Sequence, residues 1–360
     1  MKIFFLCYPP DVSEIVGYEH GIVALAEGLS QLGHEIYGNI NYWQRSTDPD
    51  DFLIRAAPSS DLNDYDVVVF SFHYYALKNE GLLPEDLFSK TRKYALIFID
   101  AIAGVITPGF RDELRGADLV LKAHFNRKQD TPENFTPWQF GLTNRIIDYS
   151  KPKAFTERRR VISTNFRVMH YARRRWEEIA QQHIYTMYPK DDETDGFEVP
   201  DFNDLDMLFW RQTDKRHYPN YFERMGNTAF CCTIGGEVKT RFLYRGNMFS
   251  KLVTAAVERL MTLEFERINQ FDSWRLWESF TSGCCTIHYD LEKYGCELPV
   301  MPEKNVHYLA LDFTDVPSFV EQISDFDHVE QIAKNGSEWA MTHYAPKPTA
   351  ERFIKLVEAL

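Results

Sequence analysis

The stretch QFDSWRLWESFTSGC, residues 270–284, says most about the fold of this chain. Arg275 and Glu278 are three residues apart, so they share one face near the start of a predicted helix, residues 274–281. The first N–H groups of a helix have no partner within it, and together with Ser273 they suit a phosphate. A carboxylate one turn further along can accept two hydrogen bonds from a ribose diol. An amphipathic helix with a surface Arg–Glu pair would give the same pattern.

The same stretch resembles the donor-site helix of the GT-B glycosyltransferases, followed by a small-residue turn and an apolar strand. In many retaining members the pattern is E-x7-E, whose second Glu holds the ribose of the nucleotide. Glu278 matches that second Glu, whereas Gln270 stands at the position of the first. The resemblance implies a donor site that includes Ser273, Trp274, Arg275 and Glu278. Gln270 departs from the retaining pattern, which slightly favours inversion or a loss of activity.

Two further features resemble the donor side of the same family. The helix, strand and turn that end at residue 236 resemble the segment that delivers a glycine-containing loop to the nucleotide. Gly235 and Gly236 would allow the backbone to approach a diphosphate, with Lys239 or Arg241 as the countercharge, although an ordinary tight turn has the same sequence. Arg167 follows the first strand of the second half and could reach the same diphosphate.

Candidate bases lie in the N-terminal half. The segments GYEHG, residues 17–21, and GHE, residues 33–35, resemble the opening loop, helix and second strand of the family. A GxGxxG fingerprint is absent, which excludes a dehydrogenase. Some inverting members place a general base where this chain has His20, and an imidazole with a pKa of about 6.5 suits that task. Asp100, at the end of a predicted strand, is the alternative base. Either side chain could instead only cap or orient its loop.

Outside these motifs, short apolar runs alternate with helical patterns, which predicts parallel sheets with both faces covered. In the first half we expect a helix over residues 21–32 and strands over 2–8, 34–37, 66–72, 94–100 and 118–123. In the second half we expect strands over 161–166, 207–210, 228–234 and 284–289. The helices expected there cover 172–183, 218–225, 250–267, 274–281 and 351–360.

These two series predict an α/β fold of two Rossmann-like domains facing a cleft, as in GT-B proteins. A chain of 360 residues suits two cores, and the polar stretch 150–160 marks the linker. We expect an acceptor-side domain over residues 1–155 and a nucleotide-sugar-binding domain over 156–340. The resemblance further implies that a C-terminal helix, residues 341–360, packs back on the first domain.

Composition limits the partners. The net charge of −13 argues against a nucleic-acid binder, because neutralising phosphates requires clustered Lys and Arg. The basic segment 158–175 could touch an anionic acceptor or a membrane surface, but we interpret it as a solvated helix face. There is no apolar run of membrane-spanning length and no signal peptide, so we expect a cytoplasmic protein with at most peripheral membrane contact. The six cysteines lack metal spacing and are expected to be buried, reduced thiols.

The function predicted from the sequence is the transfer of a sugar from a nucleotide-diphosphate sugar to an acceptor hydroxyl. The acceptor could be a glycan, a lipid-linked sugar or a small molecule. We expect neither cofactor nor metal, because the DxD-like segments 48–50 and 204–206 lie in polar stretches. A nucleotide-sugar epimerase and a catalytically idle binding subunit of the same fold remain alternatives.

Overall fold

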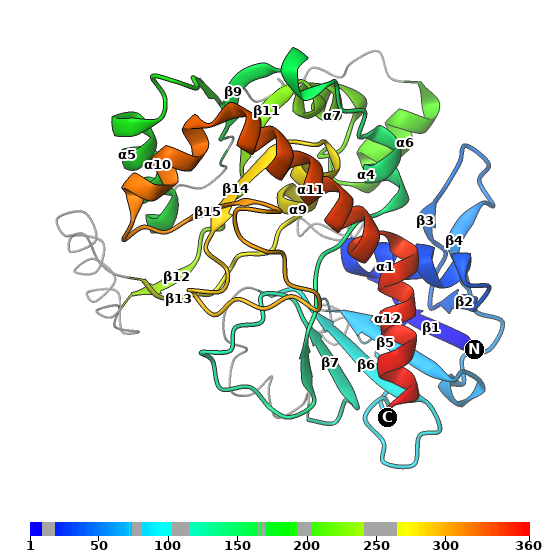
Figure 1. Ribbon diagram of the computed structural model, residues 1–360. Coiled ribbons are helices and arrows are strands. Elements are labelled where there is room, and N and C mark those ends of the chain that lie inside the picture. The colour runs from blue at the N-terminus through cyan, green and yellow to red at the C-terminus, as the bar shows by residue number, and fades with distance from the viewer. Residues whose placement is uncertain are drawn as a thin grey trace.

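The computed structural model describes residues 1–8, 19–71, 73, 81, 83–102, 115–164, 166, 170–192, 203–240 and 265–360. Within these residues the strands form two separate main sheets, one in each half of the chain. A third pair, β12 (Val238–Thr240) and β13 (Phe265–Ile268), runs antiparallel. Figure 1 shows the blue and cyan strands of the first half in one lobe and the green and yellow strands of the second half in the other.

The first sheet has eight strands in the order β3-β4-β2-β1-β5-β6-β7-β8. All neighbours are parallel except β3, which runs antiparallel to β4 at the edge. The centre consists of continuous apolar runs, as expected for strands covered on both faces. The bounds are β1 (Lys2–Leu6), β2 (Glu35–Gly38), β3 (Tyr42–Gln44), β4 (Phe52–Ala56), β5 (Val67–Ser71), β6 (Ala95–Asp100), β7 (Leu119–Lys122) and β8 (Phe135–Pro137).

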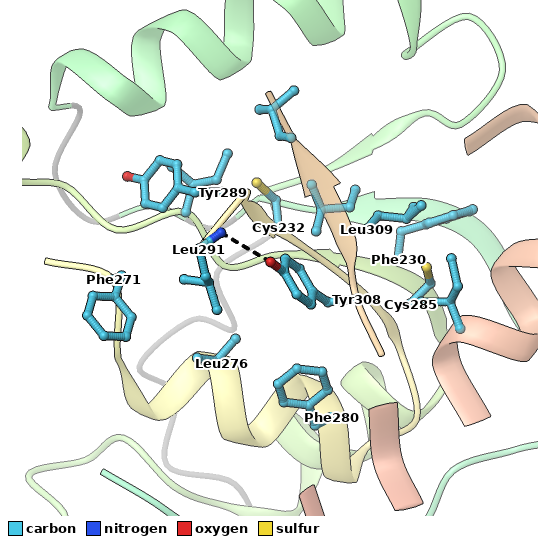
Figure 2. Close-up of a cluster of buried hydrophobic side chains, with 14 of the residues drawn as sticks. Phe230, Cys232, Phe271, Leu276, Phe280, Cys285, Tyr289, Leu291, Tyr308 and Leu309 are labelled. Carbon is cyan, nitrogen blue, oxygen red and sulfur yellow. Dashed lines mark hydrogen bonds between the residues drawn. The ribbon is translucent and has the colours of Figure 1, made fainter. Parts of the chain in front are cut away.

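The second sheet has five parallel strands in the order β10-β9-β11-β14-β15. The bounds are β9 (Arg159–Ser163), β10 (Lys190–Asp191), β11 (Thr228–Cys232), β14 (Cys285–Tyr289) and β15 (Leu309–Leu311). Figure 2 shows its apolar core, in which Leu276 and Phe280 of the helix α9 (Trp274–Thr281) lie near Tyr308. The hydroxyl of Tyr308 accepts a hydrogen bond from Leu291 N at 3.1 Å. All six cysteines are buried and free, as the sequence predicts.

Most predicted helices are confirmed, and α9 has the predicted bounds. The described helices also include two short 3-10 turns, η1 (Leu62–Asp64) and η2 (Phe155–Glu157). The α-helices besides α9 are α1 (His20–Gln31), α4 (Asn144–Tyr149), α5 (Tyr171–His183), α6 (Asp204–Gln212), α7 (Pro219–Gly226), α10 (Val316–Ser324), α11 (Phe326–Tyr344) and α12 (Pro346–Glu358).

Two sequence predictions were wrong. The strand expected over 207–210 lies inside α6, because Asn203 caps that helix by accepting a hydrogen bond from Asp206 N at 2.8 Å. A four-residue apolar run does not distinguish a strand from a helix, and here Phe209 stacks on Trp43 of β3 at 5.7 Å. The last residues of the helix expected over 250–267 lie in the strand β13 instead, where Phe265 and Arg267 pair with β12. The remainder of that range lies outside the described residues.

The two halves are joined by more than the chain between them. Arg158, in the stretch expected as a linker, donates hydrogen bonds to Lys153 O and Ser282 O, so this stretch is anchored to the second half. Beyond α11, the helix α12 crosses to the first half and packs along α1 (Figure 1). Its residues Ala350 and Phe353 belong to the apolar core beneath α1. The domain boundaries at residues 155 and 340 remain predictions.

The contact between α1 and α12 depends on Gly28. A Cβ atom at this position would lie 1.9 Å from the backbone oxygen of Pro346 and 2.8 Å from Cβ of Ala350. Gly28→Ala is therefore expected to destabilise the fold by about 1 to 3 kcal/mol through overpacking, measured by urea unfolding. Gly21→Ala on the same helix is the control, because its Cβ would meet only Ile99 Cγ2 at 3.4 Å. Equal unfolding midpoints for the two variants would contradict this account.

Candidate functional site

The start of α9 is held by contacts from both halves of the chain. Ser273 is the N-cap, and its hydroxyl accepts a hydrogen bond from Leu276 N at 3.4 Å. The buried carboxylate of Asp272 accepts one hydrogen bond from the Trp277 indole and one from Phe140 N, both at 2.7 Å. Burial raises the pKa of Asp272 to about 7, against the opposing effect of these donors. The helix start is therefore fixed in place across the junction.

Two histidines of opposite hydrogen-bonding role hold the turn just before this helix. The Nδ1 atom of His124 lies 3.3 Å from Phe271 N and 3.1 Å from Asp272 N, so it accepts from both. His288, on β14, donates through Nε2 to Phe271 O at 2.9 Å. Burial lowers the pKa of His124 well below its ordinary value and that of His288 to about 3. Both rings are therefore neutral at pH 7.

Glu278 lies one turn into α9 and is buried, with a polar side chain beside each carboxylate oxygen. Oε1 lies 2.5 Å from Nε2 of His217, and Oε2 accepts a hydrogen bond from the Tyr221 hydroxyl at 2.6 Å. Burial alone would raise the pKa of Glu278, but His217, Tyr221 and Arg275 together lower it to about 2. Burial and the guanidinium of Arg145 lower the pKa of His217 to about 4. A neutral His217 thus lies in contact with an anionic Glu278.

The other donor-side residues lie close to this helix. The ring of Trp274 lies 5.8 Å from that of His217, with the Arg216 guanidinium 4.7 Å from its centroid. Gly236 N donates to the Gln270 side-chain oxygen at 3.3 Å, so Gln270 ties the glycine turn to the residues before α9. A Cβ at Gly235 would lie 1.9 Å from Gln270 O, and one at Gly236 would lie 2.2 Å from the ring of His170. Neither position therefore has space for a Cβ atom, because the Gln270 backbone lies against Gly235 and the His170 ring lies against Gly236.

The two bases expected from the sequence, His20 and Asp100, have different surroundings in the structure. His20 faces the second half: its ring lies 5.7 Å from that of Trp274, and its Nε2 lies 2.8 Å from Gly141 O. Burial lowers the pKa of His20 to about 3, which makes it a weak proton acceptor. Asp100 is also buried and pairs with Lys122 at 2.8 Å, and burial raises its pKa. These contacts do not favour either side chain as a base, and both roles remain untested.

A different cluster, Glu19, Ser71 and His73, lies at the carboxyl ends of the first-sheet strands and was missed by the sequence analysis. Oε1 of Glu19 accepts hydrogen bonds from Nδ1 of His73 at 3.0 Å and from the Ser71 hydroxyl. The His73 ring stacks on Tyr8 at 5.3 Å. Because a carboxylate only accepts, Nδ1 of His73 carries a proton and Nε2 is the basic nitrogen. The signal was the polar pair Ser71 and His73 at the end of a buried strand.

Some of the candidate donor-site residues lie outside the described residues. Arg167, Arg241 and the side chain of Lys239 are not among the described residues. Within the described part of the chain, no three or more His, Cys, Asp or Glu side chains are grouped to hold a metal ion. The helices of that same part include none with the length and apolar character needed to cross a bilayer.

Comparisons with known proteins support the fold. No family model and no curated protein matches the sequence. An alpha-glucosyltransferase in complex with UDP matches the structure with a TM-score of 0.53 at 11% identity, over 99% of each chain. Anabaena Alr3699/HepE in complex with UDP-glucose gives 0.52 at 11% identity over 100% of each chain. A glycosyltransferase from Rickettsia africae gives 0.53 at 11% identity, over 99% of this chain and 98% of its own. The GT-B fold predicted from the sequence is confirmed.

Proposed function

We propose that this chain is a glycosyltransferase that moves a sugar from a nucleotide-diphosphate sugar to an acceptor hydroxyl. The observation that carries the proposal is a fixed helix start followed, one turn later, by the anionic Glu278. Oε2 of Glu278 accepts from the Tyr221 hydroxyl and Oε1 lies 2.5 Å from Nε2 of His217, and the remaining acceptor capacity of this carboxylate would take the ribose diol. The first N–H groups of α9 suit the diphosphate. The shared fold with glycosyltransferases supports the same function.

The proposed reaction uses no metal. Charge on the leaving diphosphate would be stabilised by the N–H groups at the start of α9 and by Arg275. The turn at Gly235 and Gly236 lies against Gln270, which precedes the helix. This turn would therefore border the diphosphate. Arg167 and Arg241 remain candidates for further countercharge.

The nucleotide we propose is UDP, because solved proteins of the same fold carry UDP or UDP-glucose. For the acceptor we propose a glycan, a lipid-linked sugar or a small molecule. One structural neighbour was solved with UDP and a 13-mer DNA. The net charge of −13 in the present chain disfavours DNA as its acceptor.

For the base we propose His73, oriented by Glu19. The pair lies at the carboxyl edge of the first sheet, the edge where ligands bind in open α/β sheets. Glu19 directly precedes His20, whose ring lies 5.7 Å from that of Trp274 at the start of α9, so the Glu19 end of the pair adjoins the junction with the donor helix. A histidine whose Nδ1–H is fixed by a carboxylate can take a hydroxyl proton at Nε2.

A thermal-shift experiment tests the donor site. UDP at 100 times its dissociation constant is expected to stabilise the fold by about 2.7 kcal/mol, because only the folded chain binds it. Uridine, which lacks the diphosphate, is the matched control and should give a smaller shift at equal concentration. GDP, dTDP and ADP extend the screen to other bases. No shift with any of the four diphosphates would contradict the proposed function.

Turnover separates the remaining alternatives. A glycosyltransferase consumes UDP-sugar only with an acceptor, whereas an epimerase would convert the donor alone. An idle subunit would bind UDP without turnover, an alternative that Gln270 keeps open. Product analysis with and without a panel of acceptors distinguishes the three.

A further inference from the structure

We propose that His124 is a positioning residue that forms the phosphate-facing turn before α9 from the opposite half of the chain. Donor binding would then depend on the docking of the two halves. This inference rests on the proposed function, because it assumes that the start of α9 receives the diphosphate. It assigns to the first half a part in a site that the sequence places wholly in the second.

The hydrogen bonds of His124 act on the backbone that leads into the donor helix. A single ring nitrogen, Nδ1, accepts from the N–H groups of both Phe271 and Asp272. The next residue, Ser273, is the N-cap of α9. Without that acceptor, two buried N–H groups would lack a partner, which favours a rearranged turn.

The backbone conformation of His124 supports its role as a positioning residue. Its φ is +56°, in the left-handed region that residues with a Cβ rarely adopt. Such a conformation persists only where the surroundings enforce it, and it often marks a functional position. The ring is buried, with the ring centroid of Phe140 at 5.6 Å and that of Phe271 at 5.8 Å.

The residues that follow His124 fasten the same segment to the second half. The side-chain amide of Asn126 donates to Ile268 O and to Tyr294 O, both at 3.0 Å. Arg127 N donates to Gly295 O at 2.9 Å, and Glu297 N donates to Phe125 O at 2.9 Å. These bonds keep the segment docked when the His124 ring is changed, so a substitution at 124 should act locally on the turn.

Three variants separate the acceptor from the backbone. His124→Asn keeps an acceptor near the place of Nδ1 and tolerates a positive φ. His124→Gly relieves the backbone but removes the acceptor, and His124→Gln keeps polarity while moving the acceptor further from the chain. Each variant is assayed for UDP and uridine affinity by calorimetry. Amide hydrogen exchange is measured over residues 268–276.

We expect His124→Gly and His124→Gln to weaken UDP binding about 10- to 100-fold, with uridine affinity changed less than threefold. Exchange at Phe271 and Asp272 should accelerate at least about tenfold. His124→Asn should keep UDP affinity within about threefold of the wild type and keep both amides protected. If His124→Gly does not fold, the comparison of His124→Gln with His124→Asn decides in the same way.

Two results would overturn the proposal. The first is wild-type UDP affinity in both His124→Gly and His124→Gln. The second is a loss of UDP affinity in His124→Asn as large as in those two variants. If wild-type protein binds none of the four diphosphates, the proposed function fails by itself. Hydrogen exchange then still tests the turn, because it needs no ligand. Unchanged protection of Phe271 and Asp272 in His124→Gln would show that His124 does not hold this turn.

Discussion

His73→Ala is expected to lower sugar transfer about 100- to 10,000-fold while UDP still binds, the usual range for a missing general base. The reason is the geometry of the pair: Glu19 accepts from Nδ1 of His73, which directs the basic character to Nε2. Glu19→Gln should have a smaller effect, because an amide can still accept from Nδ1 but lacks the charge that stabilises an imidazolium. Steady-state turnover with UDP-sugar and acceptor measures the loss, and calorimetry with UDP confirms that the donor site is intact.

The controls are the two bases expected from the sequence. His20→Ala and Asp100→Asn are assayed in parallel with donor binding checked in each. Full loss of turnover in one of them, with His73→Ala near normal, would return the role of base to that residue. Near-normal turnover in all three variants would mean that none of these side chains is the base, and a retaining mechanism would then be favoured.

Glu278→Ala is expected to weaken UDP binding by about 1 to 3 kcal/mol, or about 5- to 150-fold, through the loss of charge-assisted hydrogen bonds. The same substitution leaves the His217 imidazole and the Tyr221 hydroxyl buried without their acceptor, so the fold should lose stability as well. Urea unfolding and calorimetry therefore have to be measured on the same preparation.

Tyr221→Phe is the matched control for Glu278→Ala. It removes one donor to the carboxylate but leaves the anion, so UDP affinity should change by less than about threefold. Unchanged UDP affinity in a folded Glu278→Ala protein would remove Glu278 from the donor site. A decrease confined to stability would leave it only a structural role.

The elements predicted well are those whose signals are local. The helix α9 follows from Ser273 as a cap and from the apolar spacing of Leu276, Trp277 and Phe280. The strand β14 follows it after the short turn at Ser282 and Gly283. Spacing along the sequence was enough for these elements because neighbouring residues determine them.

The parts that could not be predicted are those formed by residues far apart in sequence. His124 and Asp272 are separated by 148 positions, and Phe140 and Asp272 by 132, so no spacing rule connects them. The role of His217 beside Glu278 likewise depends on how α7 packs. In the sequence Gln270 is a departure from the retaining pattern, whereas in the structure its side-chain oxygen accepts a hydrogen bond from the Gly236 amide. Hydrogen bonds between the two halves of the chain therefore become visible only in the structure.

The position of α12 has a consequence for biosynthesis. A ribosome makes α1 early, but Ala350 and Phe353, which complete the apolar core beneath α1, emerge only after the whole second sheet. The nascent first half therefore carries an uncovered apolar surface during most of translation, a state in which chaperones bind and aggregation begins. The two halves should then reach their native states together, late in synthesis, rather than one after the other.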